Sequence, residues 1–173
     1  MMKAGMSLVG AAVLATGLAI SGARAAEMSE QAVRSYMGYA WAMTPAQFTK
    51  PDGVKILIDK KKREAVEVPV DVAREVILTA YRTARAQMCE MTQEGIDNHN
   101  SLMLREVQKK KWSDQQIVYI NMLHLTVVQL MTSKVKIVEK DGDKVVVEEE
   151  LKSKAVKPCA DDERARLKEQ IAA

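Results

Sequence analysis

The N-terminal segment places the strongest constraint on this chain, because it has the pattern of an export signal that is removed before folding. Lys3 precedes an apolar run from Met6 to Ile20, and Ala23-Arg24-Ala25 forms an A-x-A cleavage site. The run is shorter than the roughly 20 apolar residues that a membrane-spanning helix needs. We therefore predict a cleavable signal peptide at 1–25, a single mature domain at 26–173 located in the periplasm, and no integral membrane segment after cleavage.

Removal of the signal leaves a chain that is almost neutral. The full sequence has 26 basic and 23 acidic residues, and two of the basic ones, Lys3 and Arg24, belong to the signal. Acidic residues accompany the lysine runs at 60–63 and 109–111, which indicates solvated turns or helix ends. An exported chain with this charge is not expected to bind nucleic acid.

Hydrophobic periodicity predicts an α+β fold that is predominantly helical, with about four to five helices. Ser113–Gln116 has the pattern of a capping box that opens a helix. This helix, 114–132, is apolar nearly all round, which predicts that it is central and largely buried. Asp71 is the expected N-cap of another long helix, and Gly95 is expected to end it. Helices are predicted at 29–43, 71–94, 98–110, 114–132 and 161–171.

Two stretches alternate with a period of two and predict β-hairpins. The first covers 54–70 with a charged tip at 59–64, and the second covers 135–149 with its turn at 140–143. Before the first hairpin, Thr44–Gln47 has the capping-box pattern and predicts a short helix.

The two cysteines, Cys89 and Cys159, are expected to pair, because thiols oxidise in the compartments that exported chains reach. On a helical wheel of 71–94, Cys89 lies away from the apolar face and beside Arg85. A terminal segment carrying Cys159 can therefore cover it, and we predict a disulfide that tethers the C-terminal helix. The alternative is a reactive thiol, whose thiolate Arg85 would favour.

Soft metal ligands gather between residues 88 and 103. Met88, Met91, His99 and Met103 are the residue types that suit Cu(I), and they are the candidate ligands for a copper-handling function. Methionine packing in a core with few aromatic residues explains the methionines without a metal. We therefore predict no cofactor and keep copper handling as an alternative.

The histidines have structural explanations. His124 is predicted to be a neutral, hydrogen-bonded core residue. His99 is expected near a helix start, where capping or exposure explains it. Neither has the spacing of an H-E-x-x-H zinc site, and nucleotide-binding glycine loops and G-x-S-x-G are absent from the sequence.

Two short segments, Met43–Gln47 and Leu125–Gln129, resemble the L-T-x-x-Q signature of small periplasmic helical chaperones. The resemblance covers ten residues and implies a helical, chaperone-like stress protein. In that family the motif opens helices, which fits Thr44 but not Thr126. The two predicted hairpins and the cysteine pair depart from the family pattern, so we do not assign the chain to it.

These patterns favour a non-enzymatic exported protein that binds another macromolecule or serves as an envelope accessory. They contain no catalytic motif and identify neither the partner nor the oligomeric state. A chaperone-like stress protein, a copper-handling protein and an enzyme with an unrecognised site are the alternatives.

Overall fold

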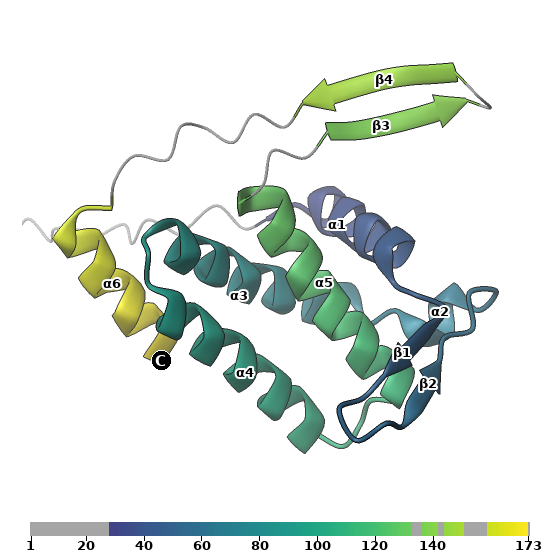
Figure 1. The fold of residues 1–173 in the computed structure, drawn as a ribbon, viewed down its shortest axis with the longest axis horizontal. Coiled ribbons are helices and arrows are strands. Elements are labelled where there is room, and N and C mark those ends of the chain that lie inside the picture. Colours follow the sequence, from purple (N-terminus) through teal and green to yellow (C-terminus); the bar gives the residue numbers. More distant parts are fainter. Residues whose placement is uncertain (1–27, 133–135, 142–143, 151–158, 173) are drawn as a thin grey trace, which may run out of the picture.

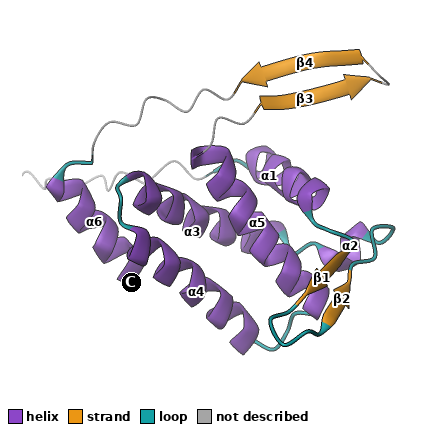
Figure 2. Ribbon diagram, in the orientation of Figure 1, coloured by secondary structure: helices purple, strands orange, loops and turns teal. Residues whose placement is uncertain are grey.

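The computed structural model describes residues 28–132, 136–141, 144–150 and 159–172, and these are mainly helical (Figures 1 and 2). The predicted class is thereby confirmed in its helical part. The signal at 1–25 lies outside the described residues. None of the described helices is long and apolar enough to cross a membrane.

The elements are α1 (Glu30–Met43), β1 (Gln47–Thr49), β2 (Lys55–Leu57), α2 (Arg63–Val66), α3 (Val70–Met88), α4 (Thr92–Gln108), α5 (Asp114–Thr132), β3 (Lys136–Asp141), β4 (Lys144–Glu150) and α6 (Asp161–Ala172).

The central helix is α3, and α1, α4, α5 and α6 all pack against it. The prediction that 114–132 is largely buried agrees with the structure, in which α5 packs on α3, α1 and α4, but the central position belongs to α3, and α5 leaves Leu125 44% exposed. Small side chains give α3 its position: Ala73, Ala80 and Ala84 are fully buried, and helices approach closely where the contact residues are small. One core cluster joins α3 to α1, α5 and the segment around α2.

Thr44 ends α1 and does not begin a new helix. The Thr44 hydroxyl donates a 2.7 Å hydrogen bond to the Ala40 carbonyl one turn earlier, and the backbone of Thr44 is extended. The short helix predicted after Thr44 is therefore wrong, and the chain continues into β1. At the other end of α1, the Ser29 side chain accepts from the Ala32 N–H, as an N-cap does.

The first predicted hairpin is correct in only one of its strands. β2 pairs antiparallel with β1, so that Phe48 lies opposite Ile56, and Gly53 makes the turn at φ 86°. The predicted second strand is instead α2 and an extended segment that reaches Pro69. Val66 and Val68 are both buried there. Their period of two reflects burial in the common core and not pairing in a sheet.

The corner between α3 and α4 also differs from the prediction. Helix α3 starts after Pro69, so Asp71 lies in its first turn and does not cap it. Glu90, at φ 59°, follows the end of α3, whereas Gly95 lies inside α4. A Cβ atom on Gly95 would be 3.6 Å from the Ala86 Cβ, which is an ordinary van der Waals contact, so Gly95 lies where α4 packs on α3 and the packing would accommodate an alanine.

The predicted capping box at the start of α5 is confirmed. The Gln116 N–H donates to the Ser113 hydroxyl at 3.2 Å, and the Ser113 N–H donates to the Gln116 side chain at 3.1 Å. This reciprocal pair of bonds fixes where α5 begins.

The remaining elements follow α5. β3 and β4 form an antiparallel pair with a register shift between Glu139 and Lys140, which corresponds to the hairpin predicted at 135–149. The last helix, α6, packs on α3 and α4 at the end of the helical body where α3 meets α4 (Figure 1).

Candidate functional site

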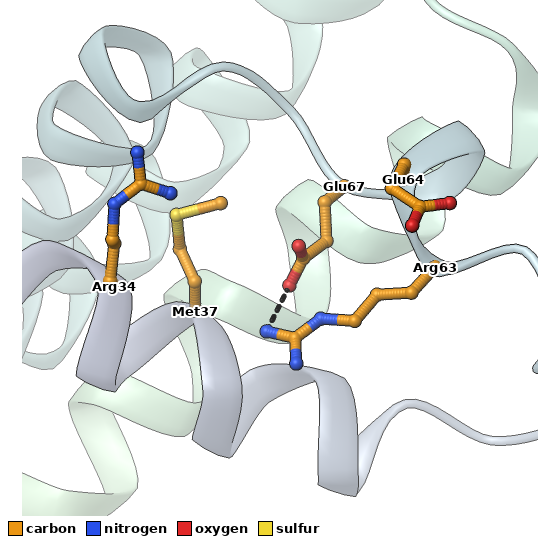
Figure 3. A pocket seen from close by; sticks show the side chains of 5 residues that line it. All are labelled: Arg34, Met37, Arg63, Glu64 and Glu67. Carbon is orange, nitrogen blue, oxygen red and sulfur yellow. Dashed lines mark ion pairs between the residues drawn. The ribbon is translucent and has the colours of Figure 1, made fainter.

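A cleft of about 280 Å³ lies between α1 and the segment around α2 (Figure 3). Arg34 and Met37 come from α1, and the other lining residues come from α2 and the residue after it. We call this the α1–α2 cleft. Its five lining residues are Arg34, Met37, Arg63, Glu64 and Glu67.

Glu67 is the most firmly held charged group of the cleft. Its side chain is 17% exposed, and Arg63 Nη2 lies 2.8 Å from its Oε1. The Tyr119 hydroxyl, which belongs to α5, lies 3.1 Å from the same oxygen and 3.0 Å from the Met37 carbonyl. Arg63 of α2 and Tyr119 of α5 therefore contact the carboxylate, and the Met37 carbonyl of α1 accepts from the same Tyr119 hydroxyl.

The pKa shifts of Tyr119 and Arg63 favour the hydrogen bonds that both groups donate to Glu67. Burial, with the negative charge of Glu67 beside it, raises the pKa of Tyr119, which stays a hydroxyl donor. The hydrogen bond to Glu67 raises the pKa of Arg63, which stays a cation. Arg63 is thus a permanent donor to Glu67, and the single hydroxyl proton of Tyr119 is shared between Glu67 and the Met37 carbonyl.

Arg34 supplies the second guanidinium of the cleft, on the opposite wall (Figure 3). It is 62% exposed, and Glu30 one turn earlier accepts from it at 2.6 Å. A guanidinium has five N–H donors in a planar fork, so a single carboxylate uses only part of them. Arg34 and Arg63 both retain donors for a ligand.

Lys60 holds the segment before α2 against the end of α1. Its ammonium donates to the carbonyls of Trp41 and Thr44 at 2.7 and 2.8 Å and lies 3.9 Å from the centre of the Trp41 ring. Burial, together with the charge of Arg63, lowers the pKa of Lys60. The prediction of a solvated turn or helix end at 60–63 is confirmed, because all four side chains are exposed, although Lys60 and Arg63 also make specific contacts.

A polar cluster is buried among α3, α4 and α5. His124 is 1% exposed, and its Nε2 lies 3.0 Å from the Thr83 hydroxyl. Asn98 donates to the same hydroxyl at 2.8 Å, which leaves the hydroxyl proton of Thr83 directed at His124. His99 Nε2 donates to Asn121 at 2.8 Å. The two imidazole rings lie 4.6 Å apart between centroids.

Desolvation determines the charge state of His124 in this cluster. Burial, with a smaller effect of His99, lowers the pKa of His124 to about 3. The prediction of a neutral, hydrogen-bonded core histidine is confirmed. The prediction that His99 stands near a helix start is wrong, because His99 lies inside α4 and is half-buried against His124. Neither histidine lines the α1–α2 cleft.

Cys89 and Cys159 form a disulfide with 5.3 Å between their Cα atoms. Cys89 is buried in a second cluster that α6 covers with Leu167. The predicted pairing and the predicted tether of the C-terminal helix agree with this geometry. Arg85, proposed as the activator of a reactive thiol, instead donates to Glu163 of α6 at 2.6 Å. The sulfur atoms lie within 4.8 Å of the Glu163 carboxylate, but bonded to each other they are not thiolate ligands.

The predicted copper ligands are distributed over several environments. Met91 belongs to the cluster around the disulfide, and Met103 packs against the main core. Met88 is the last residue of α3 and is half-buried. His99 contacts His124, which was not among the candidate ligands. The copper hypothesis stays untested.

Sequence reasoning missed the α1–α2 cleft. The spacing of Arg63 and Glu67, four residues apart, was a signal for an ion pair. The contribution of Tyr119 had no such signal, because it comes from a helix more than fifty residues away. A scan of protein-family models and searches of curated proteins and of solved structures found no match to the chain.

Proposed function

We propose that the protein is an exported, non-enzymatic binding protein that holds a segment of another polypeptide in the α1–α2 cleft. The observation that carries the proposal is the Arg63–Glu67 ion pair, which contacts Tyr119 and lines the same cleft as Arg34. A fixed pair of opposite charges at the surface suits recognition, because its position does not have to be organised when a partner binds.

The lining of the cleft supports a polypeptide as the ligand. Its volume, about 280 Å³, lies at the lower end of the range of about 300 to 1,000 Å³ for small-molecule sites and is sufficient for one or two side chains. Its lining combines two guanidinium groups, two carboxylates and the thioether of Met37, and these five residues include no hydroxyl, thiol or imidazole. We expect a segment with charged side chains of both signs around an apolar one.

Export supports the same proposal independently. The N-terminal segment has the features of a cleavable signal. A disulfide that closes a long stretch of chain is typical of proteins in oxidising compartments. Intact mass of the protein recovered from the periplasm should correspond to a chain that starts at Ala26 or Glu27.

Peptide selection tests the cleft. The mature protein is immobilised and used to select from a displayed library of random dodecapeptides. Selected peptides should lose most of their affinity for Arg34→Glu and for Glu64→Arg, because each variant reverses one charge of the lining. They should keep their affinity for Lys61→Glu, a charge reversal in the exposed loop beside α2. Equal binding to all three variants, or no enrichment at all, would refute the proposal.

A further inference from the structure

Three side chains with metal-binding atoms meet where α6 is attached to the helical body. Cys89 directly follows α3 and is 1% exposed, whereas Cys159, just before α6, and Glu163, in its first turn, are half-buried. Their two sulfur atoms and one carboxylate oxygen lie within 4.8 Å of one another. Within the described ranges, no other three His, Cys, Asp or Glu side chains meet in this way. We call these three residues the α6 anchor.

The spacing of these atoms is close to that of ligands around one Zn²⁺ ion. Zn²⁺ binds thiolates and carboxylates in a tetrahedron with bonds of about 2.0 to 2.3 Å, so that two of its ligand atoms are about 3.3 to 3.8 Å apart. In the disulfide the two sulfur atoms are bonded to each other and are closer than this. Once that bond opens, the sulfur atoms need to separate by only about 2 Å to bind one ion.

Arg85 supplies the positive charge that such a site needs. Its Nε, at 2.6 Å, and its Nη2 both contact Glu163 Oε1, so the second carboxylate oxygen is the one available to a metal. Two thiolates and a carboxylate exceed the charge of Zn²⁺ by one negative charge, which the guanidinium balances. A neighbouring arginine also favours the thiolate form of a cysteine. Hydrogen bonds to a ligating carboxylate are usual around protein metals.

We propose that the α6 anchor is a Zn²⁺ site in the reduced chain, with Cys89, Cys159 and Glu163 as ligands and water as the fourth. The site exists before the disulfide forms or after a dithiol reductant opens it. The dithiol gives two electrons to the sulfur–sulfur bond and becomes a disulfide itself, and its two protons leave Cys89 and Cys159 as thiols. Zn²⁺ then replaces these protons, which pass to water.

The α6 anchor thus has two ways of attaching α6 to the end of α3. In the oxidised chain the attachment is the covalent bond, and in the reduced chain it is the metal. The donor set of two thiolates and one carboxylate differs from the methionine and histidine ligands of the copper hypothesis. The proposal does not rest on the α1–α2 cleft, to which none of these residues belongs.

Metal uptake by the mature protein, reduced with a water-soluble phosphine in the absence of oxygen, tests the site. We expect equilibrium dialysis to find one Zn²⁺ per reduced chain and none per oxidised chain. Co²⁺ in place of Zn²⁺ should give the intense near-ultraviolet absorption of a cobalt–thiolate bond. Cys89→Ala/Cys159→Ala should take up neither ion. No uptake by the reduced wild type, or equal uptake by the oxidised protein or by the double variant, would overturn the proposal.

Replacement of the carboxylate tests its role as a ligand. Glu163→Gln should weaken Zn²⁺ binding at least about tenfold, a loss that follows even from removing an outer-shell partner. Arg85→Gln breaks the same ion pair but keeps all three ligands, so it should lose less affinity and keep the Co²⁺ spectrum of the wild type. Glu169→Gln, on the exposed side of α6, should bind as the wild type does. Equal affinity in the two glutamate variants, or an equal loss in Arg85→Gln and Glu163→Gln, would exclude Glu163 as a ligand.

Hydrogen exchange tests whether the metal replaces the covalent attachment. In the reduced protein without metal, the amides of α6 should exchange much faster than in the oxidised protein, and Zn²⁺ should restore most of their protection. Leu167, the buried residue of α6, lies in the cluster that this attachment covers. Exchange in α6 that Zn²⁺ leaves unchanged in the reduced protein would contradict the proposal.

Discussion

Trp112 Nε1 donates a 2.9 Å hydrogen bond to Glu106 Oε2, and the Glu106 side chain is only 1% exposed. The other carboxylate oxygen accepts from Lys109 at 2.8 Å. Glu106 thus joins the end of α4 to the loop that leads into α5. Burial opposes its ionisation, but the hydrogen bonds from Lys109 and Trp112 outweigh that effect, and the pKa of Glu106 lies below its ordinary value.

Replacement of this carboxylate should destabilise the fold. We expect Glu106→Gln to lower the free energy of unfolding by about 1 to 3 kcal/mol, because a buried charged acceptor for two donors is lost. Urea unfolding measures the change, and Glu169→Gln on the exposed side of α6 is the control. Since the folded-state pKa is depressed, the contribution of Glu106 is complete above pH 4.5 and is lost as the pH falls through the folded-state value. An equal loss in both variants would contradict this role.

His124 should make the fold sensitive to pH in a different window. The unfolded state takes up a proton near pH 6.5, but the folded state does so only near 3. Stability from His124 is therefore complete above pH 6.5 and falls as the pH decreases toward 3. In His124→Gln the free energy of unfolding should change much less between pH 6.5 and 4.5. His99→Gln should keep most of the slope, because burial is the main cause of the shift; a lost slope in that variant would assign the effect to His99.

The disulfide should account for most of the attachment of α6. It spans 70 residues, and a cross-link of that length stabilises by about 4 kcal/mol in the chain-entropy model. We expect Cys89→Ala/Cys159→Ala to lose a comparable amount and α6 to exchange its amide hydrogens much faster. Lys168→Ala, which removes only the surface ion pair with Glu94, should have a much smaller effect. Unchanged exchange in α6 of the double variant would show that packing of Leu167 is sufficient.

Lys60 should contribute to stability through α1. We expect Lys60→Met to lower the free energy of unfolding by about 1 kcal/mol, since a cation at the last carbonyls of a helix is lost. Thermal unfolding at low salt measures the change. Lys61→Met is the control, because it removes a neighbouring lysine but leaves the Lys60 bonds to Trp41 and Thr44 in place. A smaller effect for Lys60→Met than for the control would be inconsistent with capping.

Local sequence patterns predicted elements where the decisive contacts are local. The capping box of Ser113 and Gln116 is formed by residues three apart, and it gave the start of α5 correctly. The position of Cys89 outside the main core, where α6 covers it, agrees with the helical wheel, and the pairing with Cys159 followed from the predicted compartment. Each of these inferences needs only one element or one chemical condition.

The prediction failed where tertiary contacts override a local preference. Thr44 has the sequence of an N-cap, but its hydroxyl turns back to Ala40 and closes α1. Gly95 looks like a helix end, but it is buried inside α4, where that helix packs on α3. The α1–α2 cleft depends on Tyr119, which periodicity identified only as a member of a buried helix. Contacts between distant elements leave no regular spacing in the sequence.

The bond between Cys89 and Cys159 also changes the topology of the chain. Helix α5 and helix α6 both pack on α3, and Cys89 stands at the end of that same helix. Because the disulfide joins Cys89 to Cys159, all residues between them form one covalent ring, which includes α4, α5 and the stretch between Thr132 and Cys159. A protease that cuts this stretch once produces two pieces that stay joined, and the product keeps the mass of the intact chain plus one water until a reductant separates them.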